Sequence, residues 1–327
     1  MKFLITSTVP DRINTNSSIR KYVADGFRSA FPEMIVNDCP LSLATSLILK
    51  NKPDVVISLG GLAVDNVDLW SLRSACDKSE AKLVFWLHDD PYEFDYSFKV
   101  NNIADIVLTN DAWAKEHYNH PQVHHLPLAG CHIRHFREIS AAKTLDAFFC
   151  GVAYPNRINI FHQLVPVLNN FKTKLMGDNW PSDIPFAFNK RINTEQFCDI
   201  ANKSKIVFNI GRDFNLANKK FELVPTTPGP RTFEVALAGA AQMYFVDSLE
   251  IIDYFSENDE ILLFDNVNDV RRILERAIDE PEWILNIAQA AQNKALKQHT
   301  YMNRAITIIK FLDLENNESI NEVSDAN

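Results

Sequence analysis

The chain has 327 residues. A single hydrophobic core seldom grows beyond about 250–300 residues, so this length predicts two domains. The composition, with 46% hydrophobic and 23% charged residues, is that of a globular protein, and the net charge of −9 argues against general nucleic-acid binding, which needs a basic face.

The first part of the chain alternates short apolar runs with helical patterns. It opens on one short apolar run that lacks the hydrophobic region of a signal peptide. Buried parallel strands are predicted at residues 3–6, 55–59, 83–87, 106–109 and 124–126. Helices are predicted at residues 18–31 and 41–50. This alternation predicts an open parallel sheet with helices on its faces.

A second series of the same kind begins near Leu145, after a linker predicted at residues 130–144. Its strands are predicted at residues 146–150, 172–175, 206–210, 242–246 and 261–263. The fold class is therefore α/β, with two Rossmann-like doubly wound domains that face a central cleft at their strand ends. The predicted parts are residues 1–137, 138–290, a C-terminal helix at 291–315 and a disordered polar tail at 316–327.

Polar groups and glycines follow two strands of the first domain. His88, Asp89 and Asp90 end the strand predicted at 83–87, and an imidazole beside carboxylates can act in proton transfer. The alternative is that one aspartate caps a turn before the next proline. Gly60 and Gly61 would let the backbone approach an acceptor closely, or would simply form a turn.

Three polar residues of the second domain are predicted to face the cleft. Arg157 lies at the start of the first helix of this domain, where a cation can meet a phosphate, although an isolated arginine is more often only solvated. Asn209 lies at the end of a predicted strand and Arg212 follows it. Both are predicted to contribute to ligand binding, because open α/β sheets bind ligands at this edge.

The most informative stretch runs from Pro228 to Gly239. Prolines and a glycine end one element, Arg231 and Thr232 begin a predicted helix, and Glu234 falls in its first turn. A helix N-terminus offers free N–H groups and partial positive charge to a phosphate, and a carboxylate one turn inside can accept hydrogen bonds from ribose hydroxyls. The stretch predicts a nucleotide-diphosphate site; the alternative is an ordinary buried helix.

Several segments together resemble the CgeB-like, spore-maturation-type glycosyltransferases. They follow one another in family order over about residues 80–310: Trp86–Pro91, Ala104–Asp111, His125–Ala129, Arg231–Gly239 and His299–Arg304. The resemblance implies a GT-B fold, a nucleotide-sugar donor, with UDP-sugars favoured, held mainly by the second domain, and a C-terminal helix crossing back to the first. It also implies a retaining, hexosyltransferase-like reaction that needs no cofactor and no essential metal.

The resemblance transfers to few residues individually. Glu234 matches the glutamate that contacts the ribose in GT-B enzymes with a paired-glutamate motif. The partner glutamate would lie eight residues earlier, where this chain has Thr226, so the pair is broken. Arg231 and Arg157 match as basic candidates for the diphosphate. The metal-dependent GT-A alternative usually carries an Asp-x-Asp triplet, and none occurs in this sequence.

Two other functions fit the same pattern. A nucleotide-sugar epimerase would have the same fold, and a non-catalytic nucleotide-sugar-binding protein would explain the missing glutamate. The acceptor stays open among carbohydrate, lipid-linked, protein and modified-base classes. Five scattered cysteines without a Cys-x-x-Cys pair argue against a zinc site or disulfide framework and predict a cytoplasmic protein. No apolar run approaches the length of a membrane span.

Overall fold

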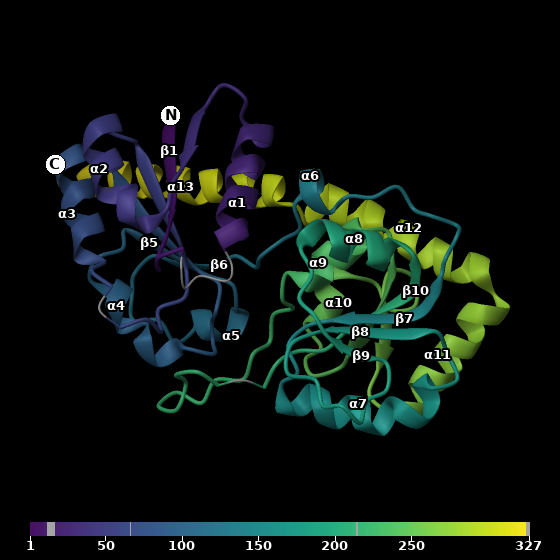
Figure 1. Cartoon of the computed structure of the whole chain (residues 1–327). Helices are drawn as coiled ribbons and strands as arrows, with labels where there is room; N and C mark the ends of the chain where they lie inside the picture. The colour runs from purple at the N-terminus through teal and green to yellow at the C-terminus, as the bar shows by residue number, and fades with distance from the viewer. Residues whose placement is uncertain (12–16, 66, 214, 325–327) are drawn as a thin grey trace.

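The computed structural model describes residues 1–11, 17–65, 67–213 and 215–324, with side chains described as far as residue 312. Two α/β domains lie side by side and are joined by a linker that contains α6 (Figure 1). Each domain is built on one six-stranded sheet whose neighbouring strands all pair in parallel.

The sheet of the N-terminal domain has the strand order β2-β1-β3-β4-β5-β6. Its strands are β1 (Lys2–Ser7), β2 (Ile35–Asp38), β3 (Val55–Gly60), β4 (Lys82–Leu87), β5 (Ile106–Thr109) and β6 (Val123–His125). The helical segments are α1 (Ser17–Ala30), α2 (Leu41–Asn51), α3 (Trp70–Ser79), η1 (Phe94–Tyr96), α4 (Phe98–Asn101), α5 (Ala112–Lys115) and α6 (His132–His135). Helices bury both faces of the central strands, which explains the continuous apolar runs of β3 and β4.

The sheet of the C-terminal domain has the strand order β12-β11-β10-β7-β8-β9. Its strands are β7 (Leu145–Cys150), β8 (Thr173–Gly177), β9 (Ala187–Asn189), β10 (Ser204–Asn209), β11 (Ala241–Phe245) and β12 (Leu262–Phe264). Its helices are α7 (Pro155–Leu168), α8 (Thr194–Asn202), α9 (Arg231–Leu237), α10 (Ile251–Tyr254), α11 (Val267–Asp279) and α12 (Pro281–Gln298). This is the Rossmann strand order, and the direction of winding reverses between β7 and β10.

The ten strands predicted from apolar runs all form, with ends shifted by no more than two residues. Two strands were not predicted, β2 and β9. Both are short strands at a sheet edge, and most of their residues are exposed or half-buried. A strand that buries so little carries no apolar run, so the sequence pattern does not reveal it.

The last helix, α13 (Tyr301–Ser324), returns to the N-terminal domain and packs against α1 (Figure 1). Its residues Tyr301, Ala305, Ile308 and Leu312 join the core that contains Trp86. One continuous helix was predicted at 291–315. The structure has two helices there, because α12 ends at Gln298 and α13 begins at Tyr301, where Thr300 Oγ1 accepts the Asn303 N–H and caps α13. Residues 325–327 lie outside the described residues, and the tail predicted at 316–327 stays a prediction.

The segment between β10 and α9 reaches across to the N-terminal domain, as the green loop in Figure 1 shows. The backbone N–H groups of Lys219 and Lys220 donate to the Asp95 carboxylate. Leu223 packs against Phe94 and Ala114. The two domains are therefore joined by this segment as well as by the linker and α13.

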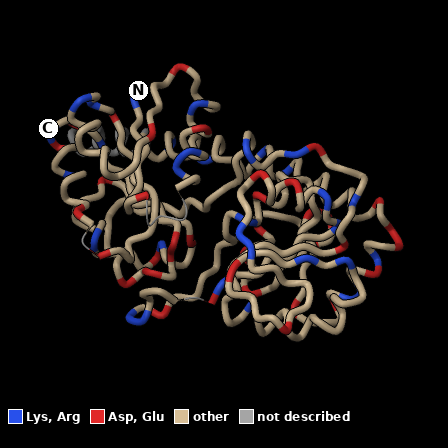
Figure 2. Tube along the Cα trace, viewed as in Figure 1, with Lys and Arg blue, Asp and Glu red and all other residues tan. Residues whose placement is uncertain are grey.

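Lysine and arginine positions are interspersed with aspartate and glutamate positions along the Cα trace of both domains in Figure 2. Within the described part of the chain, none of the helices combines the length and apolarity that crossing a membrane requires.

Candidate active site between the two domains

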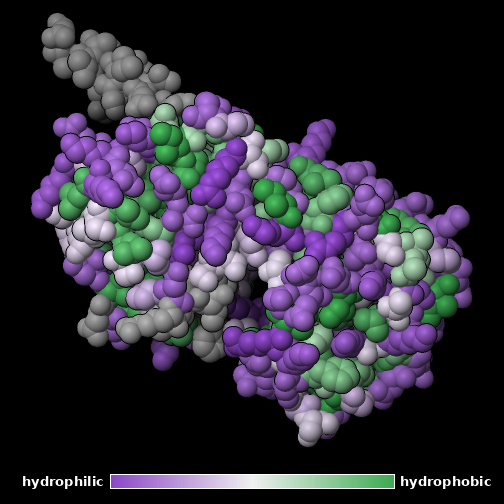
Figure 3. Space-filling view, turned by 45° about the horizontal axis from the view of Figure 1, so that its top comes forward, coloured by the Kyte–Doolittle hydropathy of each residue, from purple (hydrophilic) through white to green (hydrophobic). Residues whose placement is uncertain are grey.

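A cavity of about 420 Å³ lies between the two domains, lined by residues that follow strands of both sheets. The surface between the two lobes is hollowed in Figure 3. The N-terminal wall comes from α1, α6 and the segments after β4 and β5, and the C-terminal wall from α9 and the segments after β7, β10 and β11. The predicted cleft at the strand ends is thus present.

His88 and Asp89 stand on the N-terminal wall directly after β4. The His88 side chain is buried, its Nδ1 has no hydrogen-bond partner among the described residues, and burial lowers its pKa, which favours a neutral imidazole. Burial acts to raise the pKa of Asp89, but His88 and Arg212 outweigh it, and the pKa is lowered. Asp89 is therefore an ionised carboxylate facing the cavity.

Asp90 lies beside them but is held differently. Its Oδ2 accepts hydrogen bonds from Thr109 Oγ1 at 2.6 Å and from Tyr118 Oη at 2.7 Å. Burial raises the pKa of Asp90 to about 7 in spite of these bonds. Asp90 ties the end of β4 to the end of β5, so the geometry favours the structural alternative for this residue.

Gly60 and Gly61 serve protein contacts rather than the cavity, whose lining does not include them. A Cβ on Gly60 would collide with Thr8 Oγ1, and one on Gly61 would collide with Glu93 and lie 2.9 Å from Asp89 Oδ2. These glycines make room for neighbouring protein side chains, and their approach to a substrate stays a prediction. Glu93, which the sequence analysis missed, accepts the Leu62 N–H, and burial raises its pKa to about 7.

Arg157 lines the C-terminal wall, but its nitrogens are engaged by the protein. Nε and Nη2 donate to the carbonyl of Ile210, Nε also to that of Gly211, and Nη1 to that of Val152. Burial lowers its pKa to about 10, so the guanidinium stays charged at neutral pH. Arg157 contributes positive charge while bracing the loops after β7 and β10.

Asn209 also lines the cavity, whereas Thr232 does not. The Asn209 amide donates to Thr232 Oγ1 and to Gln242 Oε1, both at 2.8 Å. Thr232 is fully buried behind this amide. The first turn of α9 points the Thr232 side chain into the domain and Arg231 and Glu234 toward the cavity, so the structure gives no support to the prediction that Thr232 contacts a ligand.

Arg231 and Glu234 form an ion pair of 2.9 Å within one turn of α9, and the Arg231 guanidinium lies over the Phe197 ring. His135, from the linker helix α6, approaches Glu234 from the other side, with Nε2 at 3.5 Å from Oε1. The Cys131 N–H donates to His135 Nδ1, which assigns the ring proton to Nε2. The Glu234 carboxylate is thus oriented from both sides.

Arg212 links the two walls. Its Nη2 donates to Asp89 Oδ1 at 2.7 Å, and its guanidinium lies 4.0 Å from the centre of the Tyr92 ring. Burial acts to lower the pKa of Arg212, but Asp89 and Tyr92 outweigh it, and the pKa is raised. Two residues that were predicted separately, one as catalytic and one as donor-binding, therefore form a single contact.

Known proteins resemble this chain in sequence. Residues 157–310 match the family model described as "Glycosyl transferase-like". The spore protein CgeB of Bacillus subtilis (strain 168) is 22% identical over 297 residues, which are 86% of this chain and 90% of that protein. The resemblance to CgeB-like glycosyltransferases is confirmed.

Solved structures share the whole fold. Anabaena Alr3699/HepE in complex with UDP and glucose has a TM-score of 0.61 at 12% identity, covering 96% of this chain and 99% of that one. A putative UDP-N-acetylglucosamine 2-epimerase from Listeria monocytogenes has a TM-score of 0.57 at 12% identity, covering 97% of each chain. The likeness confirms the predicted GT-B arrangement of two Rossmann-like domains.

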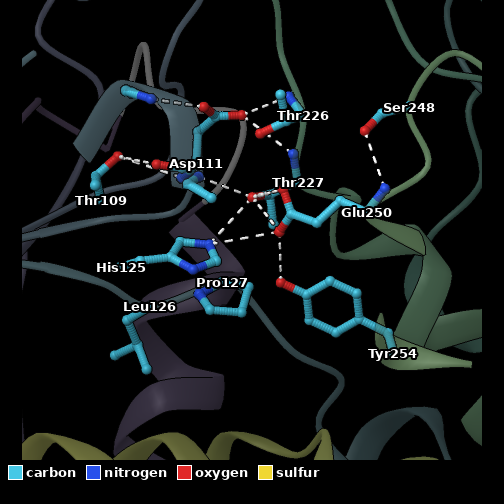
Figure 4. Close-up of polar contacts among 12 residues, drawn as sticks. Thr109, Asp111, His125, Leu126, Pro127, Thr226, Thr227, Ser248, Glu250 and Tyr254 are labelled. Carbon is cyan, nitrogen blue, oxygen red and sulfur yellow. Dashed lines mark hydrogen bonds and ion pairs between the residues drawn. The ribbon is translucent and has the colours of Figure 1, made fainter. Parts of the chain in front are cut away.

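Thr226 precedes α9 within the segment that matches the family model, at the position of the absent glutamate. Its backbone N–H donates to Asp111 Oδ2, which also accepts the Thr227 N–H (Figure 4). Its side chain lines the cavity, and the buried Thr226 Oγ1 has no hydrogen-bond partner among the described residues. A polar group therefore remains where the motif is broken, but it carries no charge.

A polar network beside the cavity ties the domains together (Figure 4). Thr227 Oγ1 lies 3.1 Å from His125 Nε2, accepts the Ala112 N–H and lies 2.8 Å from Glu250 Oε1. Tyr254 also donates to Glu250. These contacts fix the segment before α9 against the ends of β5 and β6 and so hold the two walls in register.

Proposed function

We propose that the protein transfers a sugar from a nucleotide-diphosphate sugar to a hydroxyl acceptor. The observation that carries the proposal is that the segment matching the glycosyl transferase-like family model supplies the wall with Arg212, Arg231 and Glu234. A carboxylate and guanidinium groups in one wall suit a ribose joined to a diphosphate. The shared fold with HepE, solved with UDP, supports uridine nucleotides as the first donors to test.

The arrangement divides the chemistry between the walls. Glu234 would accept hydrogen bonds from ribose hydroxyls, and the cations Arg212 and Arg231 would stabilise the leaving diphosphate as charge develops on it. On the opposite wall, His88 and Asp89 face the same space and are placed to take the proton of the acceptor hydroxyl. Closed walls would exclude water and limit hydrolysis of the donor.

Donor binding is tested by thermal unfolding with UDP, ADP and GDP and with the matching nucleosides. A ligand that binds only the folded protein raises Tm by mass action. We expect a diphosphate to raise Tm more than its nucleoside, and this difference to shrink in Arg231→Gln. Equal effects of nucleoside and diphosphate would contradict a diphosphate site.

The reaction is tested with UDP-sugars and a panel of carbohydrate, lipid-linked and peptide acceptors. Transfer to an acceptor supports the proposal, and the anomeric proton signal of the product reports the stereochemistry, which we propose is retention. A new epimer formed without acceptor would support the epimerase alternative, and donor binding without turnover would support a binding protein.

We propose that the reaction needs neither a metal nor another cofactor. In the described part of the chain, no group of three or more His, Cys, Asp or Glu side chains is arranged to hold a metal ion. Transfer should therefore continue in excess chelator. Activity that is lost with chelator and restored by manganese or magnesium would overturn this mechanism.

We also propose that the protein works in a reducing compartment such as the cytoplasm. All five cysteines are free, and four of them are buried. Cysteine thiols stay reduced in the cytoplasm, because its reducing conditions prevent disulfide formation. Thiol titration of the protein purified without reductant checks this: five reactive thiols after denaturation are expected, and disulfide-linked cysteines would contradict it.

A further inference from the structure

The three arginines that line the cavity among the described residues all have partners. Arg157 donates to main-chain carbonyls, and Arg231 pairs with Glu234 one turn along the same helix. Arg212 pairs with Asp89. A diphosphate that enters this cavity therefore meets guanidinium groups that are already engaged.

The Arg212–Asp89 pair differs from the other two because its members come from opposite walls. The two side chains are 28% and 27% exposed, so the pair is reached through the cavity rather than sealed beneath it. Separation of the walls breaks this pair, whereas the contacts of Arg157 and Arg231 lie within one domain. Arg212 is thus the cation whose partner can most easily be exchanged.

The other charges of the cavity make such an exchange necessary. The acidic side chains Asp89, Asp90, Glu234 and Asp247 line it together with the three arginines. A diphosphate adds negative charge to a site in which Arg212 and Arg231 are each already paired with a carboxylate. Asp89 Oδ1 takes the Nη2 N–H of Arg212, so a phosphate that binds this guanidinium through Nη2 has to displace the carboxylate.

We propose that Asp89 competes with the donor phosphates for Arg212, so that donor binding releases Asp89 from its ion pair. The inference rests on the proposed function and adds to it an order of substrate binding, in which the donor binds before the acceptor. Only after the donor has taken Arg212 does the Asp89 carboxylate become free beside Glu93 and the acceptor side of the cavity. The same side chain thus first opposes the donor and then serves the acceptor.

The test compares binding of UDP, ADP and GDP, and of their nucleosides, by calorimetry in wild type and Asp89→Asn. The amide introduced by this substitution can still accept a hydrogen bond from Arg212 but carries no charge. Because charge-assisted hydrogen bonds are stronger than neutral ones, we expect the variant to bind its preferred diphosphate about tenfold more tightly. Binding of the nucleoside should not change. Equal or weaker diphosphate binding would overturn the inference.

Asp95→Asn is the matched control. Asp95 also carries one negative charge and also crosses the domain interface, through the N–H groups of Lys219 and Lys220, but it does not line the cavity. This variant should bind the diphosphate as wild type does. Tighter binding in Asp95→Asn as well would assign the effect to net charge or domain separation and overturn the competition.

A double-mutant cycle with Arg212→Gln isolates the exchange. Arg212→Gln should weaken diphosphate binding, and adding Asp89→Asn to it should bring no gain, since the contested cation is gone. A gain of equal size in both backgrounds would overturn the inference. If the diphosphate binds but Asp89→Asn does not tighten its binding, only the inference is overturned. If no nucleotide binds to wild type or to any variant, the proposed function is overturned as well.

Discussion

The two walls of the cavity hold their charges in different ways. On the N-terminal wall, His88 is a buried imidazole and Asp90 a buried carboxyl whose pKa is raised to about 7, while Glu93, whose pKa is also raised to about 7, is not part of the cavity lining. On the C-terminal wall, Arg157 and Arg231 are fixed by local partners. The N-terminal wall would thus offer His88 and Asp89 to an acceptor hydroxyl and the C-terminal wall fixed cations to an anion, which is the division that sugar transfer from a nucleotide requires.

The strongest test of this division is His88→Ala. General acid–base catalysis contributes about 10²–10⁴ in rate, so turnover should fall at least about 100-fold. Donor affinity should not change, because His88 stands on the opposite wall from Arg231 and Glu234. The measurement is kcat and nucleotide Kd of the variant, with His162→Ala, an exposed histidine outside the cavity, as control. Unchanged turnover per folded molecule would remove His88 from the reaction.

The junction of the walls is tested by Asp111→Asn. Asp111 accepts the Ala114 N–H through Oδ1 and the Thr226 and Thr227 N–H groups through Oδ2. The asparagine amide has one oxygen that can accept these bonds, and its NH₂ group would face backbone N–H donors. The free energy of unfolding should therefore fall by about 2 kcal/mol. Urea denaturation measures this. A variant as stable as wild type would show that the network of Figure 4 does not hold the walls together.

Glu234→Gln tests the donor wall. Because a carboxylate is a stronger acceptor for ribose hydroxyls than an amide, donor affinity should fall about tenfold while folding survives. The loss should be smaller for the 2′-deoxy nucleotide, which lacks one of the hydroxyls. Calorimetry with both nucleotides measures the effect. An equal loss for both would mean that Glu234 acts through Arg231 rather than on the ribose.

The smallest expected effect concerns Asp90→Asn and pH. A carboxyl whose folded pKa of about 7 exceeds its ordinary 3.8 binds more protons in the folded protein, so its contribution to stability falls as pH rises from about 4 to 7. Both hydrogen bonds go to Oδ2, which the amide oxygen can replace. Asp90→Asn should therefore gain about 2–4 °C in Tm over wild type between pH 5 and pH 8. If the Tm difference between Asp90→Asn and wild type is the same at pH 5 and pH 8, the raised pKa of Asp90 is contradicted.

Sequence patterns were sufficient for most of the fold. Apolar runs located ten strands, and failed for β2 and β9 because these edge strands bury little. They also placed His88, Asp89 and Glu234 correctly on the cavity wall, since a residue at the carboxyl end of a strand or in the first turn of a helix has a position set by local structure.

What local pattern does not decide is the partner of each side chain. Distant segments of the sequence supply these partners. They provide the amide that binds Thr232, the carbonyls that bind Arg157, and the side chains that pack against Gly60 and Gly61. Glu93 follows a strand end and could have been suspected, but His135 lies in a linker that shows no pattern. The sequence by itself determined the two domains, the strand ends and the resemblance to glycosyltransferases. Only the tertiary structure decided that Asp89 meets Arg212 across 123 positions of the chain, because that contact depends on how two separately folded sheets face each other.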